Sequence, residues 1–85
     1  MKLEGKIFKG NVMWREATVI VDEPQLTFVK ELEKALIETC RSLDIPIPMW
    51  LSKNTQEFAA FRQTLFFSDQ FTEPFPYDRF QIRLL

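Results

Sequence analysis

The chain has 85 residues, of which 46% are hydrophobic and 14% aromatic, and its formal net charge is −1. A chain of this length suits one domain, so we expect a single domain over residues 1–85. The 11 basic residues face 12 acidic ones, and this lack of basic excess argues against general binding to a nucleic-acid backbone. No apolar run approaches the ~20 residues of a membrane span, and the first residues lack a signal-peptide pattern. We therefore expect a cytoplasmic protein that does not enter a membrane.

The first part of the chain reads as a β-hairpin. Residues 2–9 predict a strand with Leu3 and Ile7 on one face. The Lys9–Asn11 segment favours a tight turn, because glycine and asparagine tolerate positive φ. Residues 12–22 predict a second strand rich in β-branched residues. Both of its faces are largely apolar, so we expect this strand to be central in the sheet.

A first helix is predicted to begin at Asp22-Glu23-Pro24, where acidic residues and a proline suit the first turn, and to run to Leu43. Its apolar arc spans roughly 200°, whereas ~100° covers one packing surface. Either the second helix covers one flank of this arc, or part of it is a subunit interface. The arc holds Leu26, Val29, Leu32, Ala35, Leu36, Cys40 and Leu43, with Phe28 and Ile37 at its margins.

An extended arm and a second helix follow. Pro46 and Pro48 fix their own φ angles and disfavour helix in the residues before them. Asn54, with Glu57 three residues later, resembles a capping box, so we place the helix start at Asn54, within two residues. Large apolar residues continue from there to residue 67, and we assign them all to the helix: Phe58, Phe61, Leu65, Phe66 and Phe67.

The last part of the chain predicts a third strand. Residues 68–71 break the helical pattern, and residues 72–76 form a second proline-stiffened arm. In residues 78–85, Phe80, Ile82 and Leu84 alternate with polar residues, as in a half-buried strand. We therefore expect an α+β fold of order β-β-α-α-β, with a small three-stranded, mainly antiparallel sheet and two helices packed on one of its faces.

The residues that carry chemistry are sparse. The chain has no histidine, which removes the commonest general base and the commonest metal ligand. Gly5 and Gly10 are the only glycines, so no phosphate-binding loop is present, and the carboxylates form no metal-binding motif. Cys40, the only cysteine, lies on the apolar arc, where we expect a buried structural thiol. We expect no catalytic, cofactor-binding or metal-binding residue and favour a protein that is not an enzyme.

The surplus of apolar side chains favours a homo-oligomeric or partner-binding module. One small sheet with two helices can hardly cover all of them, and exposed apolar patches commonly mark contact sites. Trp50 is the best candidate for a contact anchor, since tryptophan dominates many interfaces, although packing over the domain's own helices explains it equally well. The candidate interface residues are Trp50, Met49, Leu51, Phe58, Phe61, Phe28 and Ile37.

Two alternatives come from other classes of function. Arg79 and Arg83 share a strand face, with Lys6 and Lys2 beside them if the first and last strands are neighbours, and such a basic face suits single-stranded nucleic acid. The balanced overall charge argues against this alternative. The second is a small-molecule site or an active site in a pocket between the sheet and the second helix.

The pattern P-x-W-L-x-x-N-x-x-E-F-x-x-F-R, from Pro48 to Arg62, together with the closing Asp78-Arg79-Phe80, resembles short single-domain bacterial proteins of unassigned function. The resemblance implies a bacterial, cytoplasmic α+β protein whose helices are available for self-association. It supplies no catalytic or binding residues.

Overall fold

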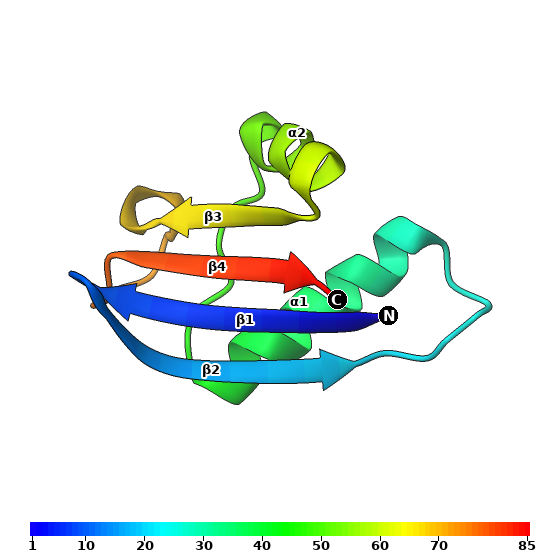
Figure 1. The fold of residues 1–85 in the computed structure, drawn as a ribbon, viewed down its shortest axis with the longest axis horizontal. Helices are drawn as coiled ribbons and strands as arrows, with labels where there is room; N and C mark the ends of the chain where they lie inside the picture. The colour runs from blue at the N-terminus through cyan, green and yellow to red at the C-terminus, as the bar shows by residue number, and fades with distance from the viewer.

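The protein is a four-stranded antiparallel sheet with the first helix packed on one face and the second helix beside one edge strand (Figure 1). The computed structural model describes residues 1–85. The strand order is β2-β1-β4-β3, so strands from the two ends of the chain lie side by side at the centre. The elements are β1 (Lys2–Lys9), β2 (Val12–Ile20), α1 (Phe28–Leu43), α2 (Ser52–Phe61), β3 (Gln63–Phe67), the 3-10 turn η1 (Ser68–Gln70) and β4 (Arg79–Leu84).

The predicted α+β class is confirmed, but the sheet has four strands rather than three. The predicted second helix ends at Phe61, and residues 63–67 form β3 instead of its last turns. Arg62 makes the change of direction, since its φ of 56° is left-handed and its backbone N–H donates to the Phe58 carbonyl at 2.9 Å. A left-handed residue after a helix ends it sharply, and glycine is the usual residue there. An arginine in that position leaves no visible stop signal in the sequence.

The prediction that the second strand is central is wrong. β2 lies at an edge of the sheet, while β1 pairs with β2 on one side and β4 on the other. The apolar residues that suggested burial on both faces stay largely in solvent, as Met13 and Ile20 do. A run of β-branched residues indicates a strand, but it does not tell how many neighbours the strand has.

The core lies between the sheet and α1. Register places Leu3 and Ile7 of β1 on the same face as Phe80 and Ile82 of β4, and all four are fully buried. α1 approaches β1 closely at Gly5, where an added Cβ would lie 2.4 Å from the Thr39 methyl group. The glycine therefore sets the distance between helix and sheet. From α1 the core receives Ala35, Leu36, Cys40 and Leu43.

The first helix begins at Phe28, six residues later than predicted. Thr27 is its N-cap, with the Thr27 side chain accepting from the Lys30 backbone N–H at 3.3 Å. The Asp22–Pro24 segment lies in the preceding turn, where the Leu26 N–H donates to the Glu23 carbonyl. A threonine cap satisfies one of the free N–H groups at a helix start, and Thr27 takes this role here in place of Asp22.

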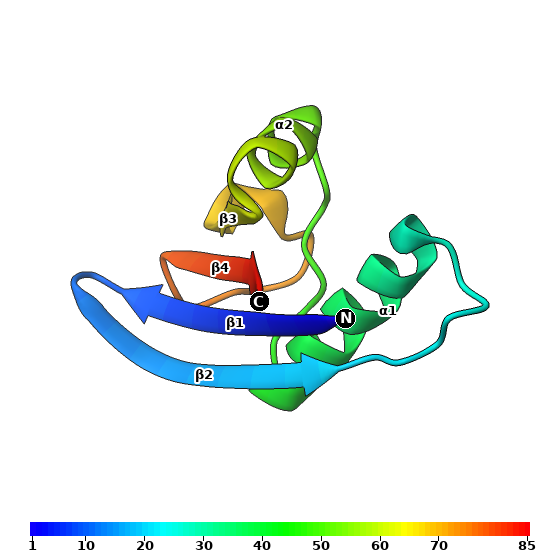
Figure 2. The ribbon, with the colours of Figure 1, turned by 45° about the vertical axis from the view of Figure 1, so that its right-hand side comes forward.

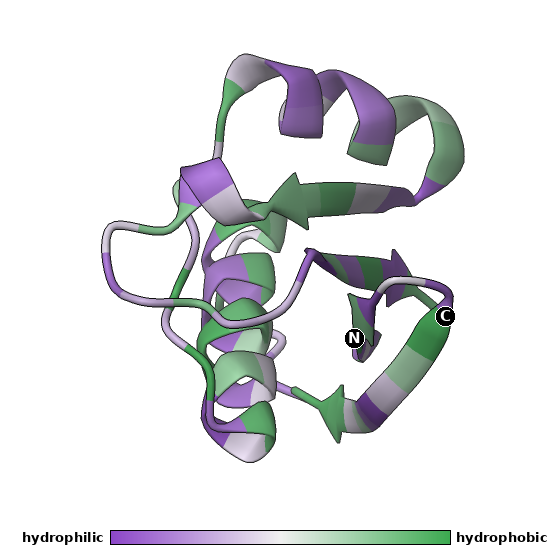
Figure 3. Ribbon diagram, turned by 90° about the vertical axis from the view of Figure 1, so that its left-hand side faces the viewer, coloured by the Kyte–Doolittle hydropathy of each residue, from purple (hydrophilic) through white to green (hydrophobic).

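The second helix stands over the β3 end of the sheet, apart from α1 (Figure 2). Leu51 is its N-cap, so the predicted cap, Asn54, lies three residues inside the helix. The Asn54 Oδ1 accepts from the Leu51 N–H at 2.9 Å, which is the backward half of a capping box. Seen from the end, α1 lies on one side of the sheet, with α2 beside β3, and the other side is bare (Figure 3).

Candidate functional site

A groove of about 600 Å³ separates α1 from α2, with the proline arm between them. Leu36 and Phe58 are nearly buried at its base, while Phe28 and Val29 on α1 are 56% and 70% exposed. Eight of its eleven lining residues are hydrophobic, so the groove is an apolar surface with access to solvent. The lining consists of Phe28, Val29, Leu32, Glu33 and Leu36 from α1, Ile47, Pro48 and Trp50 from the arm, and Thr55, Phe58 and Ala59 from α2.

The wide apolar arc of α1 is divided between two surfaces. Leu43 approaches the sheet at Gly5 and is buried, whereas Val29 turns to the groove and solvent. Helical spacing places Val29 and Leu36 on one stripe, so the groove wall follows directly from the sequence period. Part of the arc therefore builds the core, while Phe28 and Val29 are left exposed.

Trp50 forms part of both the core and the groove wall. Its indole N–H donates to the Thr55 hydroxyl at 2.8 Å, so its polar atom is satisfied within the chain. The ring centroid lies 5.8 Å from that of Phe58 and 5.6 Å from that of Phe66, in edge-to-face and tilted arrangements. Such aromatic packing holds the indole in place. A ligand in the groove would meet a preorganised tryptophan face.

The groove carries little charge. Glu33 is the one charged residue in its lining, and the Glu33 carboxylate takes part in none of the ion pairs of the structure. Lys34, the next residue along α1, is paired with Glu23 at 2.5 Å, and this hydrogen bond raises the pKa of Lys34 above its ordinary value. The groove thus combines an apolar body with one free carboxylate, which suits a cationic group at the edge of an apolar ligand.

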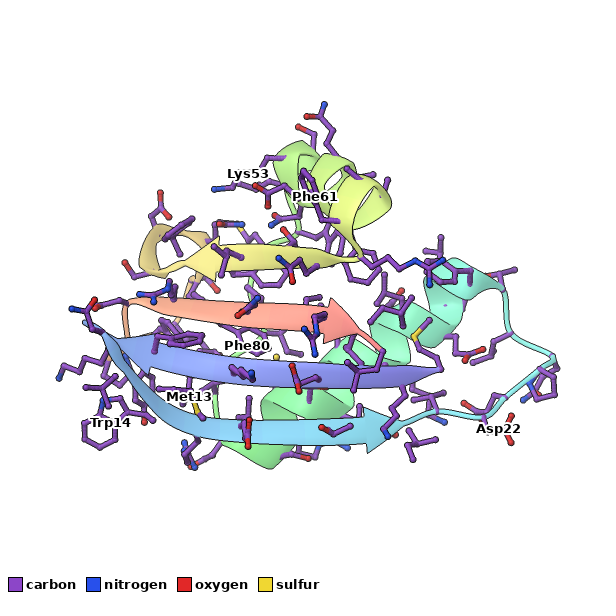
Figure 4. The ribbon with its side chains drawn as sticks, in the orientation of Figure 1. Met13, Trp14, Asp22, Lys53, Phe61 and Phe80 are labelled. Carbon is purple, nitrogen blue, oxygen red and sulfur yellow. The ribbon has the colours of Figure 1, made fainter.

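The structure brings three of the predicted interface residues together, Phe28, Trp50 and Phe58, all in the groove lining. Phe61 lies on α2 outside this lining and is 70% exposed (Figure 4). Ile37, half-buried, lies on α1 outside the same groove. Sequence reasoning did not select Ile47, an apolar residue between two prolines that the arm presents to the groove. Met49 and Leu51 are exposed elsewhere along the arm.

A second surface is the open face of the sheet. Because β1 pairs with β4, Arg79 and Arg83 do lie beside the first strand, where Lys6 and Lys2 also face solvent. The Glu4 carboxylate lies 3.7 Å from both the Lys6 ammonium and the Arg83 Nε. Because Glu4 pairs with Lys6 and Arg83, this face carries charges of both signs and is not strongly basic. The remaining arginine, Arg79, lies with its guanidinium 4.4 Å from the centroid of the Phe8 ring.

The groups that could support catalysis are few and separate. No group of three or more His, Cys, Asp or Glu side chains is placed to hold a metal ion. Cys40 is buried in the core, and this burial raises the pKa of its thiol to about 12, so the thiol is protonated at neutral pH. In the groove lining, the groups that could act as a nucleophile or a base are the Glu33 carboxylate and the Thr55 hydroxyl, and the Thr55 oxygen accepts the Trp50 indole N–H.

Comparison with protein-family models, with curated proteins and with solved structures finds no match. Neither helix has the length and apolar character needed to cross a lipid bilayer. The chemistry of the groove and of the sheet is therefore the basis for a functional proposal.

Proposed function

We propose that this protein is a non-enzymatic binding module that holds an amphipathic helix of a protein partner in the groove between α1 and α2. The observation that carries the proposal is the exposed apolar wall of α1, where Phe28 and Val29 have no covering group. Burying a large apolar side chain is worth ~1.5 to 3 kcal/mol, so a partner that covers this wall gains affinity. An amphipathic helix laid in an apolar groove is a recurrent mode of recognition.

The shape of the groove favours a helix over a small molecule. Small-molecule sites enclose about 70–90% of their ligand, which requires walls on most sides. Here Phe28, Val29 and Ile47 are half or more exposed, so the groove is shallow at its rim. Two helices already form its long walls, and a third helix would fill the space between them. Glu33 then favours a partner helix with a lysine or arginine beside its apolar stripe.

A model helix tests this proposal directly. The probe is a peptide of about 18 residues with leucine at i, i+3, i+4 and i+7 spacing and lysine beside the stripe. It is titrated into the Trp14→Phe variant, in which Trp50 is the only tryptophan and reports on the groove. We expect a saturable change in Trp50 emission, and a loss of at least about tenfold in affinity on Val29→Lys, equal to about 1.4 kcal/mol.

Phe61→Lys is the matched control, because Phe61 is as exposed as Val29 and lies on a helix outside the groove. Its affinity for the peptide should equal that of the parent. An equal loss in the two variants would show non-specific apolar binding and end the proposal. If the protein binds dodecyltrimethylammonium, a small cationic apolar ligand, saturably but does not respond to the peptide, the helix-binding proposal is wrong and the small-molecule alternative takes its place.

Single-stranded nucleic acid is the second candidate, and its support is the gathering of basic residues on the open face of the sheet. Arg83→Glu would then abolish a rise in the anisotropy of labelled oligo(dT) at low salt. Glu4→Gln is the complementary test. Because the Glu4 carboxylate neutralises part of that face, its removal should strengthen binding to the oligonucleotide. No anisotropy change at tens of micromolar protein would dismiss this candidate.

A further inference from the structure

The outer edge of β2 carries free backbone hydrogen-bonding groups. The Val21 N–H donates to the Met1 carbonyl at 2.8 Å, and the Met1 nitrogen donates to the Val21 carbonyl at 2.7 Å. Residues of an antiparallel strand alternate between pairing with one side and the other. The N–H and C=O groups of Glu16, Thr18 and Ile20 therefore point away from β1, toward solvent.

Nothing within the chain covers these groups. All three residues are exposed, and no side chain or loop makes a hydrogen bond to their backbone. β2 has nine residues and holds neither proline nor lysine, the two residues that commonly protect an edge from pairing. An edge with these properties is a template for another strand.

The opposite edge of the sheet differs because the chain covers it. The outward carbonyl of Leu65 in β3 accepts from the Asn54 Nδ2 at 3.0 Å. The Phe67 N–H donates to the Gln70 Oε1, also at 3.0 Å. The sheet can therefore be extended through β2 and is obstructed at β3, which allows a closed pair of chains but not an open-ended array.

We propose that two copies of this chain join through antiparallel pairing of their β2 strands, around a two-fold axis at Thr18, into one continuous sheet. In this register Thr18 lies opposite the partner's Thr18, and Glu16 lies opposite the partner's Ile20. The three outward-facing residues of each copy all find a partner, and each such pair exchanges two backbone hydrogen bonds. Cross-strand threonine pairs add to the stability of antiparallel sheets.

Charge disfavours one alternative register, and the irregularity of β2 disfavours another. A two-fold axis at Glu16 would place two carboxylates opposite each other, which is unfavourable for like charges on facing strands. An axis at Ala17 would pair Glu16 with the partner's Thr18 and leave Ile20 facing Trp14, where the ladder with β1 shifts register. The axis at Thr18 avoids both problems. This surface is separate from the α1–α2 groove, so the pairing does not depend on the proposed function.

Site-directed cysteines test the register. Across the proposed axis the two residue-18 Cα atoms are about 5.5 Å apart, within the range for a disulfide. Thr18→Cys should therefore form a covalent dimer under mild oxidation. In the matched control, Ile20→Cys, the two thiols are displaced by four residues, about 13 Å along the strands, and should stay free. Cys40 is buried and does not interfere.

The mass in solution tests the pairing without oxidation. Light scattering on the wild-type chain at about 100 µM should give twice the 10.1 kDa of one chain. Thr18→Lys, which places two ammonium groups at the axis, should give the monomer mass, and Gln81→Lys on central β4 should leave the dimer intact. A wild-type monomer at 1 mM, equal cross-linking of the two cysteine variants, or a Thr18→Lys dimer would each overturn the proposal.

Discussion

The two edges of the sheet are treated in opposite ways by the chain. At β3 the edge is closed by side chains of α2 and of η1, while at β2 the edge is bare along its regular part. Both edges are built from apolar and β-branched residues, so composition does not explain the difference. The difference lies in the neighbouring segments, because α2 and η1 flank β3 in the chain, whereas a short turn and a loop flank β2. One sheet can thus have an edge that ends it and an edge that is available for a partner.

Asn54 is the centre of the closed edge. It is fully buried, and its Nδ2 donates to the Thr64 hydroxyl at 2.8 Å and to the Leu65 carbonyl at 3.0 Å. Its Oδ1 accepts from the Leu51 N–H at 2.9 Å and from the Gln70 Nε2 at 3.0 Å. No buried side-chain nitrogen or oxygen in the protein lacks a partner, so this network is complete. A complete buried network rigidifies the segments that it joins.

The largest expected effect distinguishes the residues of β2 whose backbone groups bond β1 from those whose backbone groups face solvent. Ala17→Pro removes an N–H that bonds β1 and should cost about 3 kcal/mol or more in the free energy of unfolding. Thr18→Pro, one residue away, removes an N–H that faces solvent and should cost about 1 kcal/mol, chiefly from the fixed φ. Urea unfolding at a protein concentration low enough to keep the chains separate measures both values. Equal losses would show that the alternation along β2 has been assigned wrongly.

Breaking the closed edge gives the next effect. Asn54→Ala removes its bonds to the buried Thr64 and Gln70 side chains and to the partly buried Leu65 carbonyl, and each buried polar group left unsatisfied costs about 1–3 kcal/mol. We expect a loss of about 3 kcal/mol in urea unfolding. Gln56→Ala, at an exposed position of the same helix, controls for changes in helix propensity and should stay within about 0.5 kcal/mol of wild type. A loss as small as the control's would mean that the edge does not need its cap.

The smallest effect, measured between pH 8 and 10, concerns the helix that packs on β1 and β2. α1 packs against β1 and β2 and carries Cys40, whose pKa rises from 9.0 to about 12 on burial. Between these values the unfolded chain loses a proton that the folded chain keeps. The contribution of the Cys40 thiol to the free energy of unfolding is therefore fully present below pH 9. It is lost as the pH rises toward 12, by up to about 1.4 kcal/mol per pH unit.

Urea unfolding at pH 8, 9 and 10 measures how the free energy of unfolding changes with pH. The Cys40→Ala variant is the reference, because it keeps every titratable group of the protein except this thiol. The wild-type slope should exceed that of Cys40→Ala. Equal slopes for the two proteins would contradict a buried Cys40 thiol with a raised pKa.

Local patterns predict the parts of the fold whose residues repeat regularly. The hairpin, α1 from Phe28 onward and β4 each follow a clear period of the sequence. The same reasoning assigns β3 to a helix, because Phe58, Phe61 and Leu65 continue the helical spacing across the true boundary. The reversal depends on one backbone angle at Arg62, and arginine gives no sign of a positive φ. The β-branched and aromatic run from Thr64 to Phe67 is the one available signal.

Sequence patterns predict which residues belong to the candidate site, but they do not predict how these residues are arranged in space. The apolar excess of α1 and of the Pro46–Phe58 segment identifies Phe28, Trp50 and Phe58, which do meet in the groove. The distance between the two helices is set by the path of the arm and by the docking of α2 on β3. Both are tertiary properties that no local period encodes. The same holds for the edges, since an edge depends on which strands pair.

The strand order also determines when the sheet can close during synthesis. β1, β2 and α1 all lie within residues 2–43 and can assemble while later residues are still in the ribosome. The backbone groups of β1 that bond β4 have no partner until residues 79–84 emerge. β4 also pairs with β3, so its arrival joins the two halves of the protein in one step. A nascent chain halted before residue 79 therefore leaves one side of its central strand without a pairing partner, and unpaired strand edges of this kind favour aggregation.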